Sequence, residues 1–409
     1  MLEIVENRRP DTSQAESSEP LPIELMTVQM GPAHPAMHGV VRIELKLDGE
    51  NVVDADVHIG YMHRAFEKMS EISTYTQVLP YTDRLNYVSP LINNVGYVQC
   101  VEKLLEIEVP PRCQYIRVIV SEMSRVTDHL TCIAAMSMEL AAFTVFLYFI
   151  KAREYFYELV EDICGARLTT TYTRVGGLSH DLPDGFARKL KKAVADTRDV
   201  IEEVEGLVAK NRIFYDRTRG VGIVSGEQAI NYGWTGPCLR ASGVSYDVRR
   251  DVPYLVYPKL DWQVITRTEG DTYARFEVRL DEMRESLKML EQAVDDIPEG
   301  PIRVSDPRIS LPDKSQVYNS IEGLMNHFKL IIEGVRVPPG EAYFAVEGAN
   351  GELGFYIVAD GSGKPYRCRP RSPGFALTQG LAPTIKGGML SDIVPVFGSL
   401  NYIAGEVER

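Results

Sequence analysis

"CQYIRVIVSEMSRVTDHLTCI", at residues 113–133, carries an apolar residue at every third or fourth position along most of its length. This spacing places the apolar side chains on one face of a helix, where they pack into a core. No proline interrupts the chain from Cys113 to Cys164. The sequence therefore predicts one or two long helices that end at Gly165. The apolar face consists of Ile116, Ile119, Val120, Met123, Val126, Leu130 and Ile133.

Other segments have the same helical spacing. Ser89–Pro90 is a typical helix start, with serine as the cap, and predicts a helix that runs towards Glu106 and stops before Pro110. Residues 186–210, 273–297 and 315–334 also predict long helices. Several long helices in one chain favour a bundle. Residues 212–272 are rich in glycine, proline and aromatic residues and predict a loop-rich insert.

Alternating segments predict strands at both ends of the chain. "VVRIELKL" (40–47) and "VVDADVHI" (52–59) flank an Asp48–Gly49 turn, and two alternating runs flank Asn350–Gly351 near the C-terminus. The predicted fold class is α+β, a central long-helix bundle with an N-terminal β-hairpin or sheet and C-terminal β-strands. The predicted parts are a flexible arm (1–22), an N-terminal β region with a histidine-rich loop (23–65), a helical core (66–335) and a C-terminal β-strand region with a tail (336–409).

Composition excludes several classes of function. Lys and Arg number 44 against 57 Asp and Glu, a net charge of −13 without a basic run, which argues against nucleic-acid binding. No secretory signal is visible at the N-terminus. The apolar stretch 134–150 contains Glu139 and is too short for a membrane span, so we interpret it as a buried core helix. The six cysteines form no C-x-x-C pair, which favours buried thiols over a metal site.

"MGPAHPAMHG" (30–39) places His34 and His38 on a loop stiffened by two prolines, and His58 and His63 follow within thirty residues. Three interpretations are open: a metal site, histidines that hydrogen-bond within turns, or a loop that transfers protons or contacts a ligand. The motif has no cysteine or helical glutamate to complete a metal site. A buried Glu139 needs a partner such as histidine or arginine, or a polar cavity.

Further polar residues stand at helix starts or along helices. "YTDRLNYVSP" (81–90) places Arg84 and Tyr87 just before a helix, where packing and solvation alone would explain them. Glu122, Arg125 and His129 have the spacing of an intrahelical ion-pair stripe. The glycine-rich segments lack the phosphate-binding patterns, and no G-x-S-x-G elbow is present, so nucleotide binding is not expected.

Several long motifs, in order, carry a resemblance to a known family. "VQMGPAHPAMHGV", "HIGYMHRAFEK", "YTDRLNY", "SEMSRVTDHL", "YTRVGGLSHDLP", "RGVGIVSGEQAINYGWTGPCLRASGVSYDVR", "GELGFYIVADGSGKPYR" and "GEVER" resemble the family of D subunits of NADH-quinone oxidoreductase, respiratory complex I. The resemblance extends from about residue 25 to the C-terminus. That family is similar to the large subunit of nickel–iron hydrogenases, whose two C-x-x-C pairs would fall near "YTDRLNY" and "NYIAGEVER"; neither pair is present here.

The resemblance implies roles for the residues already singled out. His38 and Tyr87 would hydrogen-bond the carbonyls of a quinone, the substrate, and Glu139 falls where an aspartate usually pairs with the residue matching His38. These three would be catalytic, while His34, Met62 and His63 would line the quinone site. Arg84 would lie near the iron–sulfur cluster of the partner B subunit, which supplies the electrons. No metal or cofactor is expected on this chain itself.

The resemblance also implies partners and a location. The partners would be the B and C subunits, the I subunit and the H and A membrane subunits, with membrane contact made only through partners. The complex would be a proton-translocating NADH:quinone oxidoreductase on the cytoplasmic side of a bacterial inner membrane. The rival interpretation is a homologous subunit of a ferredoxin-fed or hydrogenase-type membrane complex. Three residues depart from the family pattern: Glu139 for aspartate, Thr169 for histidine and Asn401 for aspartate.

Overall fold

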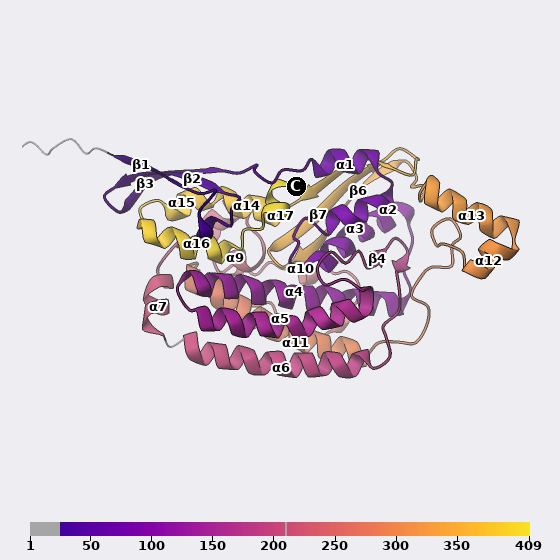
Figure 1. Ribbon diagram of the computed structural model, residues 1–409, viewed down its shortest axis with the longest axis horizontal. Helices are drawn as coiled ribbons and strands as arrows, with labels where there is room; N and C mark the ends of the chain where they lie inside the picture. Colours follow the sequence, from indigo (N-terminus) through magenta and orange to yellow (C-terminus); the bar gives the residue numbers. More distant parts are fainter. Residues whose placement is uncertain (1–24, 209–210) are drawn as a thin grey trace, which may run out of the picture.

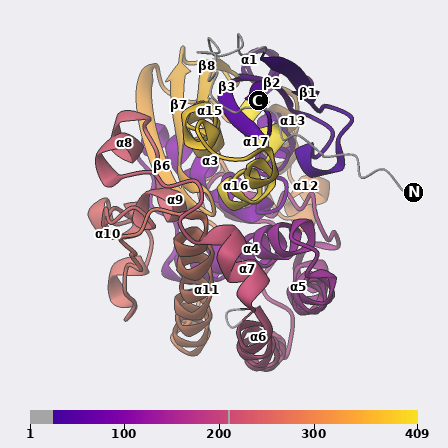
Figure 2. The same cartoon turned by 90° about the vertical axis from the view of Figure 1, so that its left-hand side faces the viewer.

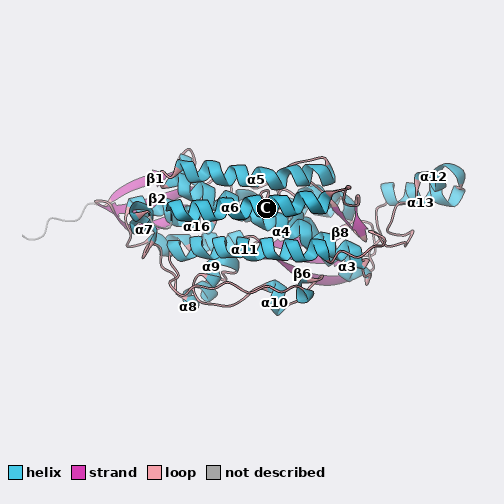
Figure 3. Cartoon of the chain, turned by 90° about the horizontal axis from the view of Figure 1, so that it is seen from below, coloured by secondary structure: helices cyan, strands magenta, loops and turns pink. Residues whose placement is uncertain are grey.

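The computed structural model describes residues 25–208 and 211–409; the predicted arm at 1–22 lies outside the described residues. Four long helices run side by side and form the bundle (Figures 1 and 3). They are α4 (Pro111–Glu139), α5 (Phe143–Cys164), α6 (Phe186–Val208) and α11 (Thr272–Asp295). The predicted helices of this region are confirmed, and α5 ends at Gly165 as expected.

The interpretation of residues 134–150 as one buried helix is wrong. The stretch is divided between α4 and α5 by a turn in which Ala141 has a positive φ of 66°. Several of its apolar side chains are exposed, Met138 to 40%, Phe143 to 56% and Leu147 to 52%. A mainly apolar run without proline or glycine contains no signal of the break, so the pattern did not predict it.

The N-terminal hairpin is confirmed and a further strand extends it. β2 (Arg42–Asp48) and β3 (Asn51–His58) pair antiparallel, and β1 (Met26–Met30) pairs with the other edge of β2. Alternation buries Ile43, Leu45 and Leu47 on one face of the sheet. This face belongs to a second hydrophobic core, separate from that of the bundle, which it shares with the C-terminal helices.

The second hairpin is also confirmed. β6 (Gly340–Gly348) and β7 (Gly351–Ala359) pair antiparallel around Ala349–Asn350, and β8 (Pro365–Arg371) pairs with β7. The helix α3 (Pro90–Leu105) packs against β6 and β7 and joins this sheet to the bundle. It begins at Pro90 as predicted, but Ser89 does not cap it; the Ser89 hydroxyl instead donates to Asp128, 2.8 Å away.

The prediction of strands and a tail for 336–409 is wrong beyond β8. The chain continues as α14 (Pro373–Gln379), α15 (Leu381–Ile385), η3 (Leu390–Asp392), α16 (Ile393–Leu400) and α17 (Ala404–Glu408). "IVPVFGSL" in α16 is almost entirely buried, and a short apolar run of this kind has no period that separates a helix from a strand.

The predicted single helix at 315–334 is two helices. α12 (Lys314–Asn319) and α13 (Ile321–Ile332) meet at Ser320, whose extended backbone breaks the helix and whose hydroxyl accepts from the Gly323 N–H at 2.9 Å. Together they stand away from the body of the molecule (Figure 1).

Short elements fill the remaining connections. The predicted loop-rich insert contains only short helices, which Figure 2 shows beside the bundle end. The short elements are η1 (Pro35–Met37), α1 (Phe66–Ile72), α2 (Tyr75–Thr82), β4 (Thr173–Arg174), β5 (Gly177–Leu178), α7 (Arg212–Thr218), α8 (Gly226–Asn231), α9 (Gly236–Arg240), α10 (Val248–Asp251) and η2 (Tyr257–Lys259).

Candidate functional site

The histidine-rich loop forms the single turn η1 between β1 and β2. His34 precedes this turn, and its Nδ1 accepts from the Ala36 N–H at 3.2 Å, so His34 has a capping role. His38 follows the turn with a φ of 54°, a left-handed conformation that few residues other than glycine adopt. This backbone directs the His38 ring to the end of α4, where Nε2 lies 3.1 Å from Glu139 Oε1.

Glu139 supplies the carboxylate of this pair. It is the last residue of α4, and its side chain is 7% exposed whereas that of His38 is 35% exposed. The carboxylate lies against α16, because a Cβ added at Gly398 would stand 2.5 Å from Glu139 Oε2. Oε2 is buried and has no hydrogen-bond partner among the described residues. His38 is thus the partner that the burial of Glu139 requires.

Aromatic rings lead from His38 to the C-terminal segment. The His38 ring meets Phe397 edge-on with centroids 5.4 Å apart, and Phe397 stacks on Tyr402 at 5.3 Å. The half-buried Tyr87 lies close enough to Tyr402 for its charge to influence that phenol. Burial raises the pKa of Tyr87, the Asp128 charge raises it further, and Arg64 opposes both. The Tyr87 phenol therefore keeps its proton at neutral pH and is available as a hydrogen-bond donor.

The C-terminal segment joins Met62 and His63 to the same region. The Tyr402 hydroxyl donates to Glu408 Oε1 at 3.1 Å, and the Met62 N–H donates to the other oxygen of that carboxylate. The His63 Nδ1 lies 2.6 Å from the Glu408 carbonyl oxygen. His63 and Glu408 also line a cavity of about 470 Å³. Sequence reasoning missed Tyr402 and Glu408, although both lie in the quoted C-terminal segment.

Arg84 lies on the surface, apart from the His38–Glu139 pair. Its guanidinium donates to the Pro80 carbonyl, and its own carbonyl accepts from Arg64 at 2.7 Å. No carboxylate within the described residues forms an ion pair with it. His34, likewise exposed, forms no hydrogen bond or ion pair with the other predicted site residues in the described part of the chain.

Asn401 belongs to a buried polar cluster. Its amide donates to Asp128 Oδ1 at 2.7 Å and to Asn350 Oδ1 at 2.6 Å. Asp128 Oδ2 accepts from Asn86 at 2.7 Å and from the Ser89 hydroxyl. An amide at position 401 satisfies the Asp128 carboxylate, whereas an aspartate would set a second carboxylate against it.

Glu122, Arg125 and His129 do not form the predicted intrahelical stripe. Only Glu122 and Arg125 pair along α4, at 3.1 Å, and both are fully buried. His129 Nε2 instead lies 3.0 Å from Glu282 on α11. Arg240, Arg249, Asp247 and Glu347 extend these contacts into one buried ion-pair network that joins α4, α9, α10, α11 and β6.

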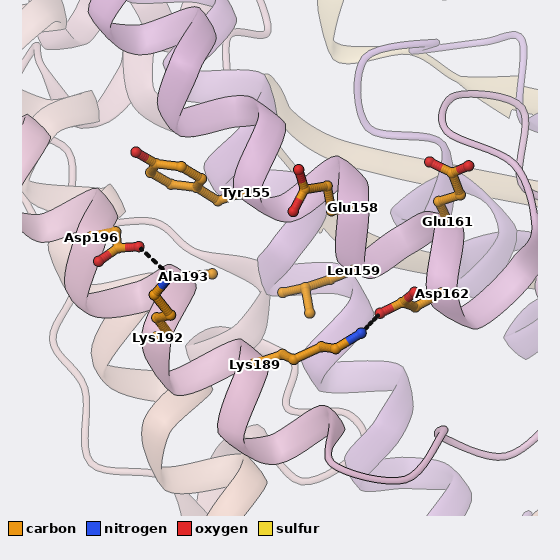
Figure 4. A pocket seen from close by; sticks show the side chains of 9 residues that line it. All are labelled: Tyr155, Glu158, Leu159, Glu161, Asp162, Lys189, Lys192, Ala193 and Asp196. Atoms are coloured by element: carbon orange, nitrogen blue, oxygen red, sulfur yellow. Dashed lines mark hydrogen bonds and ion pairs between the residues drawn. The ribbon is translucent and has the colours of Figure 1, made fainter.

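A groove between α5 and α6 has a different character. It measures about 480 Å³ and is lined mainly by charged side chains, two of which pair across it, Lys189 with Asp162 at 2.5 Å (Figure 4). None of the predicted site residues lines it.

Within residues 25–208 and 211–409 there is no group of three or more His, Cys, Asp or Glu that could hold a metal ion. In the same ranges no helix has the length and apolar character needed to cross a membrane.

These observations define the class: an α+β protein whose bundle end gathers a histidine–carboxylate pair, tyrosines and a buried C-terminal segment. Residues 139–409 match a family model described as the 49 kDa subunit of respiratory-chain NADH dehydrogenase. The chain is 53% identical over 400 residues to a D subunit of the NADH-quinone oxidoreductase of Sorangium cellulosum, covering 98% of this chain and 99% of that protein. It is 49% identical over 404 residues to the corresponding D subunit of Myxococcus xanthus, covering 98% and 97%. The chain therefore belongs to the family of NADH-quinone oxidoreductase D subunits, and the predicted resemblance is confirmed.

Proposed function

We propose that this subunit of an NADH:quinone oxidoreductase forms the quinone-headgroup site, with His38, Tyr87 and Glu139 as its catalytic residues. The observation that carries the proposal is the 3.1 Å contact between His38 and Glu139 at a half-open edge of the bundle. Met62 and His63, held by Glu408, line the loop side of the site together with His34.

The chemistry of the reaction fits these residues. Reduction of a quinone to a quinol takes two electrons and two protons. In this proposal an iron–sulfur cluster of the partner B subunit would supply the electrons, and the exposed Arg84 would face it. The protons would come from the Tyr87 phenol and from the His38 side chain, which Glu139 holds in position. Both donors are pre-positioned, because the loop and α16 fix His38 and burial fixes Tyr87.

We also infer that the bundle has the architecture of nickel–iron hydrogenase large subunits, with the metal site lost. The two segments where metal-binding cysteine pairs would fall support this inference, because both contact Asp128. Asn86 in the first segment donates to Asp128 Oδ2, and Asn401 in the second donates to Oδ1. On this inference, hydrogen-bonded amides would take the place of the thiolate ligands.

The proposal places the chain in the peripheral arm, on the cytoplasmic side of a bacterial inner membrane. Its partners there would be the B, C and I subunits and the H and A membrane subunits. The apolar side chains of Met138, Phe143 and Leu147 support contact with a membrane subunit, because they are exposed around the end of α4, next to Glu139.

The test is His38→Asn and Tyr87→Phe in the assembled complex. Asparagine tolerates the left-handed backbone of position 38, so this variant removes the proton donor without backbone strain. We expect quinone reduction to fall by about 100-fold or more in each variant. NADH oxidation with a hydrophilic acceptor that bypasses the quinone should stay unchanged. His58→Ala, at the end of β3 and outside the proposed site, is the matched control and should retain quinone reduction. Near-normal quinone reduction in both variants would refute the site.

A further inference from the structure

A cavity of about 630 Å³ lies between α2, the β4–β5 hairpin and α13. Apolar side chains form most of its wall, among them Leu79, Leu330 and Ile331. Two guanidinium groups, those of Arg174 and Arg303, also line it. We call it the Arg174–Arg303 cavity. None of the residues assigned above to the quinone site lines it.

Both arginines are held by the same rigid hairpin. Arg303 forms a β-bridge to Gly177, and its side chain donates to the carbonyls of Leu178 at 3.0 Å and Ser179 at 2.6 Å. Only glycine fits at position 177, because an added Cβ would stand 2.5 Å from the Ile302 carbonyl oxygen. The side chain of Arg303 is therefore pre-positioned before any ligand binds.

Arg174 lies on β4, and the buried Glu102–Arg117 ion pair anchors its backbone. Arg117 Nη2 donates to the Arg174 carbonyl at 3.1 Å and to the Gly177 carbonyl at 3.2 Å. Glu102 Oε1 accepts from the Gly176 N–H at 2.8 Å. The hairpin that carries Arg174 and holds Arg303 is thus fixed to α3 and α4.

Neither guanidinium of the cavity is paired with a carboxylate among the described residues. Within the described residues, the guanidinium of Arg174 makes no hydrogen bond or ion pair, and that of Arg303 bonds only to carbonyls. Burial lowers the pKa of Arg174, Asp83 opposes this, and Arg303 lowers it further, as expected for two neighbouring cations. Asp313 and Glu322 line a neighbouring groove that Arg303 also lines. Within the described residues neither carboxylate forms an ion pair with Arg303. A half-buried guanidinium without a partner is a site for an anion.

The apolar wall continues outward along α13. Leu324, Phe328 and Ile332 are 52%, 56% and 60% exposed on this helix, and Ile331, which lines the cavity, is 57% exposed. Monomeric proteins rarely leave such a surface uncovered. Because the chain belongs to a multisubunit complex, another subunit is the occupant that covers both the apolar surface and the charge.

We propose that the Arg174–Arg303 cavity is a docking site for a segment of a partner subunit that presents a carboxylate flanked by apolar side chains. The carboxylate binds between the two guanidinium groups, and the flanking apolar residues pack on Leu330 and Ile331. This inference rests on membership of the complex and not on the quinone site, so the two proposals can fail separately.

The first experiment is Arg303→Glu in the complete complex, compared with Arg308→Glu. Arg308 is the matched control, because it lies on the same loop, its side chain is 85% exposed, and its ion pair is with Asp306 two residues away. We expect Arg303→Glu to raise at least tenfold the fraction of this subunit lost from the complex on native gels, with no effect of the control. Equal retention of both variants would overturn the proposal.

A second measurement does not depend on how the variant folds. A photo-crosslinking residue at Leu311, which lines the cavity and is 47% exposed, is introduced into the otherwise native complex. We expect a crosslink to another subunit at a peptide with Asp or Glu beside apolar residues. Replacement of that acidic residue by lysine should then restore assembly of Arg303→Glu. Crosslinks only within the chain, only to a lipid or small amphiphile, or to a peptide without a carboxylate would each overturn the proposal.

Discussion

Two histidine–glutamate pairs have almost equal nitrogen–oxygen distances but differ in their exposure to solvent. His129 and Glu282 meet at 3.0 Å with side chains 0% and 3% exposed, inside the bundle. His38 and Glu139 meet at 3.1 Å at its edge, with 35% and 7% exposed. The same two side chains thus form a buried structural contact in one place and a half-open contact in the other.

The neighbours of each pair explain what it can do. Burial alone would raise the pKa of Glu282, but Arg240, 2.7 Å away, lowers it well below its ordinary value. Burial lowers the pKa of His129, although Glu282 opposes this, so the pair stays as carboxylate and neutral imidazole. Within the described residues Glu139 forms no ion pair with an arginine, and one of its oxygens has no hydrogen-bond partner. A histidine–glutamate pair can exchange protons only where no third charge fixes its state and solvent or substrate reaches it.

The largest expected effect comes from removing the charge that fixes the buried pair. Arg240→Met leaves Glu282 and Glu347 buried without their shared cation, since Arg240 contacts both at 2.7 Å. We expect a loss of about 3–5 kcal/mol in the free energy of unfolding. Hydrogen exchange of the α4 and α11 amides in the purified complex measures it. The exposed Arg198, paired with Glu291 at the surface, is the control, and Arg198→Met should change the value by less than about 1 kcal/mol. Equal effects of the two variants would contradict the comparison.

The sequence predicted the helices that have a continuous apolar period. α4, α5, α6 and α11 follow from the spacing of their own residues, and the N-terminal hairpin follows from alternation around Asp48–Gly49. The C-terminal helices did not follow, because the run in α16 is apolar on every side and only tertiary packing makes it helical. The predicted helix is interrupted at Ser320 because the Ser320 hydroxyl caps α13. The spacing of apolar residues gives no indication of such a local hydrogen bond.

The candidate site was less predictable than the fold. His38 and Glu139 are 101 residues apart in the chain, and family resemblance rather than any local pattern brought them together. Ser89 has the sequence context of a helix cap, yet its hydroxyl donates a hydrogen bond to Asp128 on α4. Glu408 was missed because a single glutamate is ordinarily solvated, whereas here it forms hydrogen bonds with Met62, His63 and Tyr402. Long-range polar contacts leave no periodic trace in a sequence.

The second expected effect tests the half-open pair through its packing. In Gly398→Ala, the new Cβ would lie 2.5 Å from Glu139 Oε2 and push the carboxylate from His38. We expect quinone reduction to fall about tenfold, with overpacking that costs about 1–3 kcal/mol. The rate of quinone reduction per assembled complex measures the first effect. Gly206→Ala is the control, because a Cβ there meets no atom within 4 Å, and alanine should slightly stabilise α6. Unchanged quinone reduction in Gly398→Ala would show that activity does not depend on the position of Glu139.

The smallest expected effect uses pH to distinguish the two histidines. Because burial lowers the pKa of His129 below the value of about 6.5 in the unfolded chain, the unfolded state binds a proton that the folded state does not. Stability should therefore fall as pH drops below about 6.5, by at most about 1.4 kcal/mol per pH unit. His129→Gln keeps a donor for Glu282 but cannot titrate, so we expect its stability to decline less between pH 7 and pH 5.5. Hydrogen exchange of α4 at the two pH values measures the difference, with His34→Gln, on the exposed loop, as the control that should keep the full decline. If His129→Gln and the native chain lost stability in parallel, His129 would not be held neutral, and the contrast with His38 would fail.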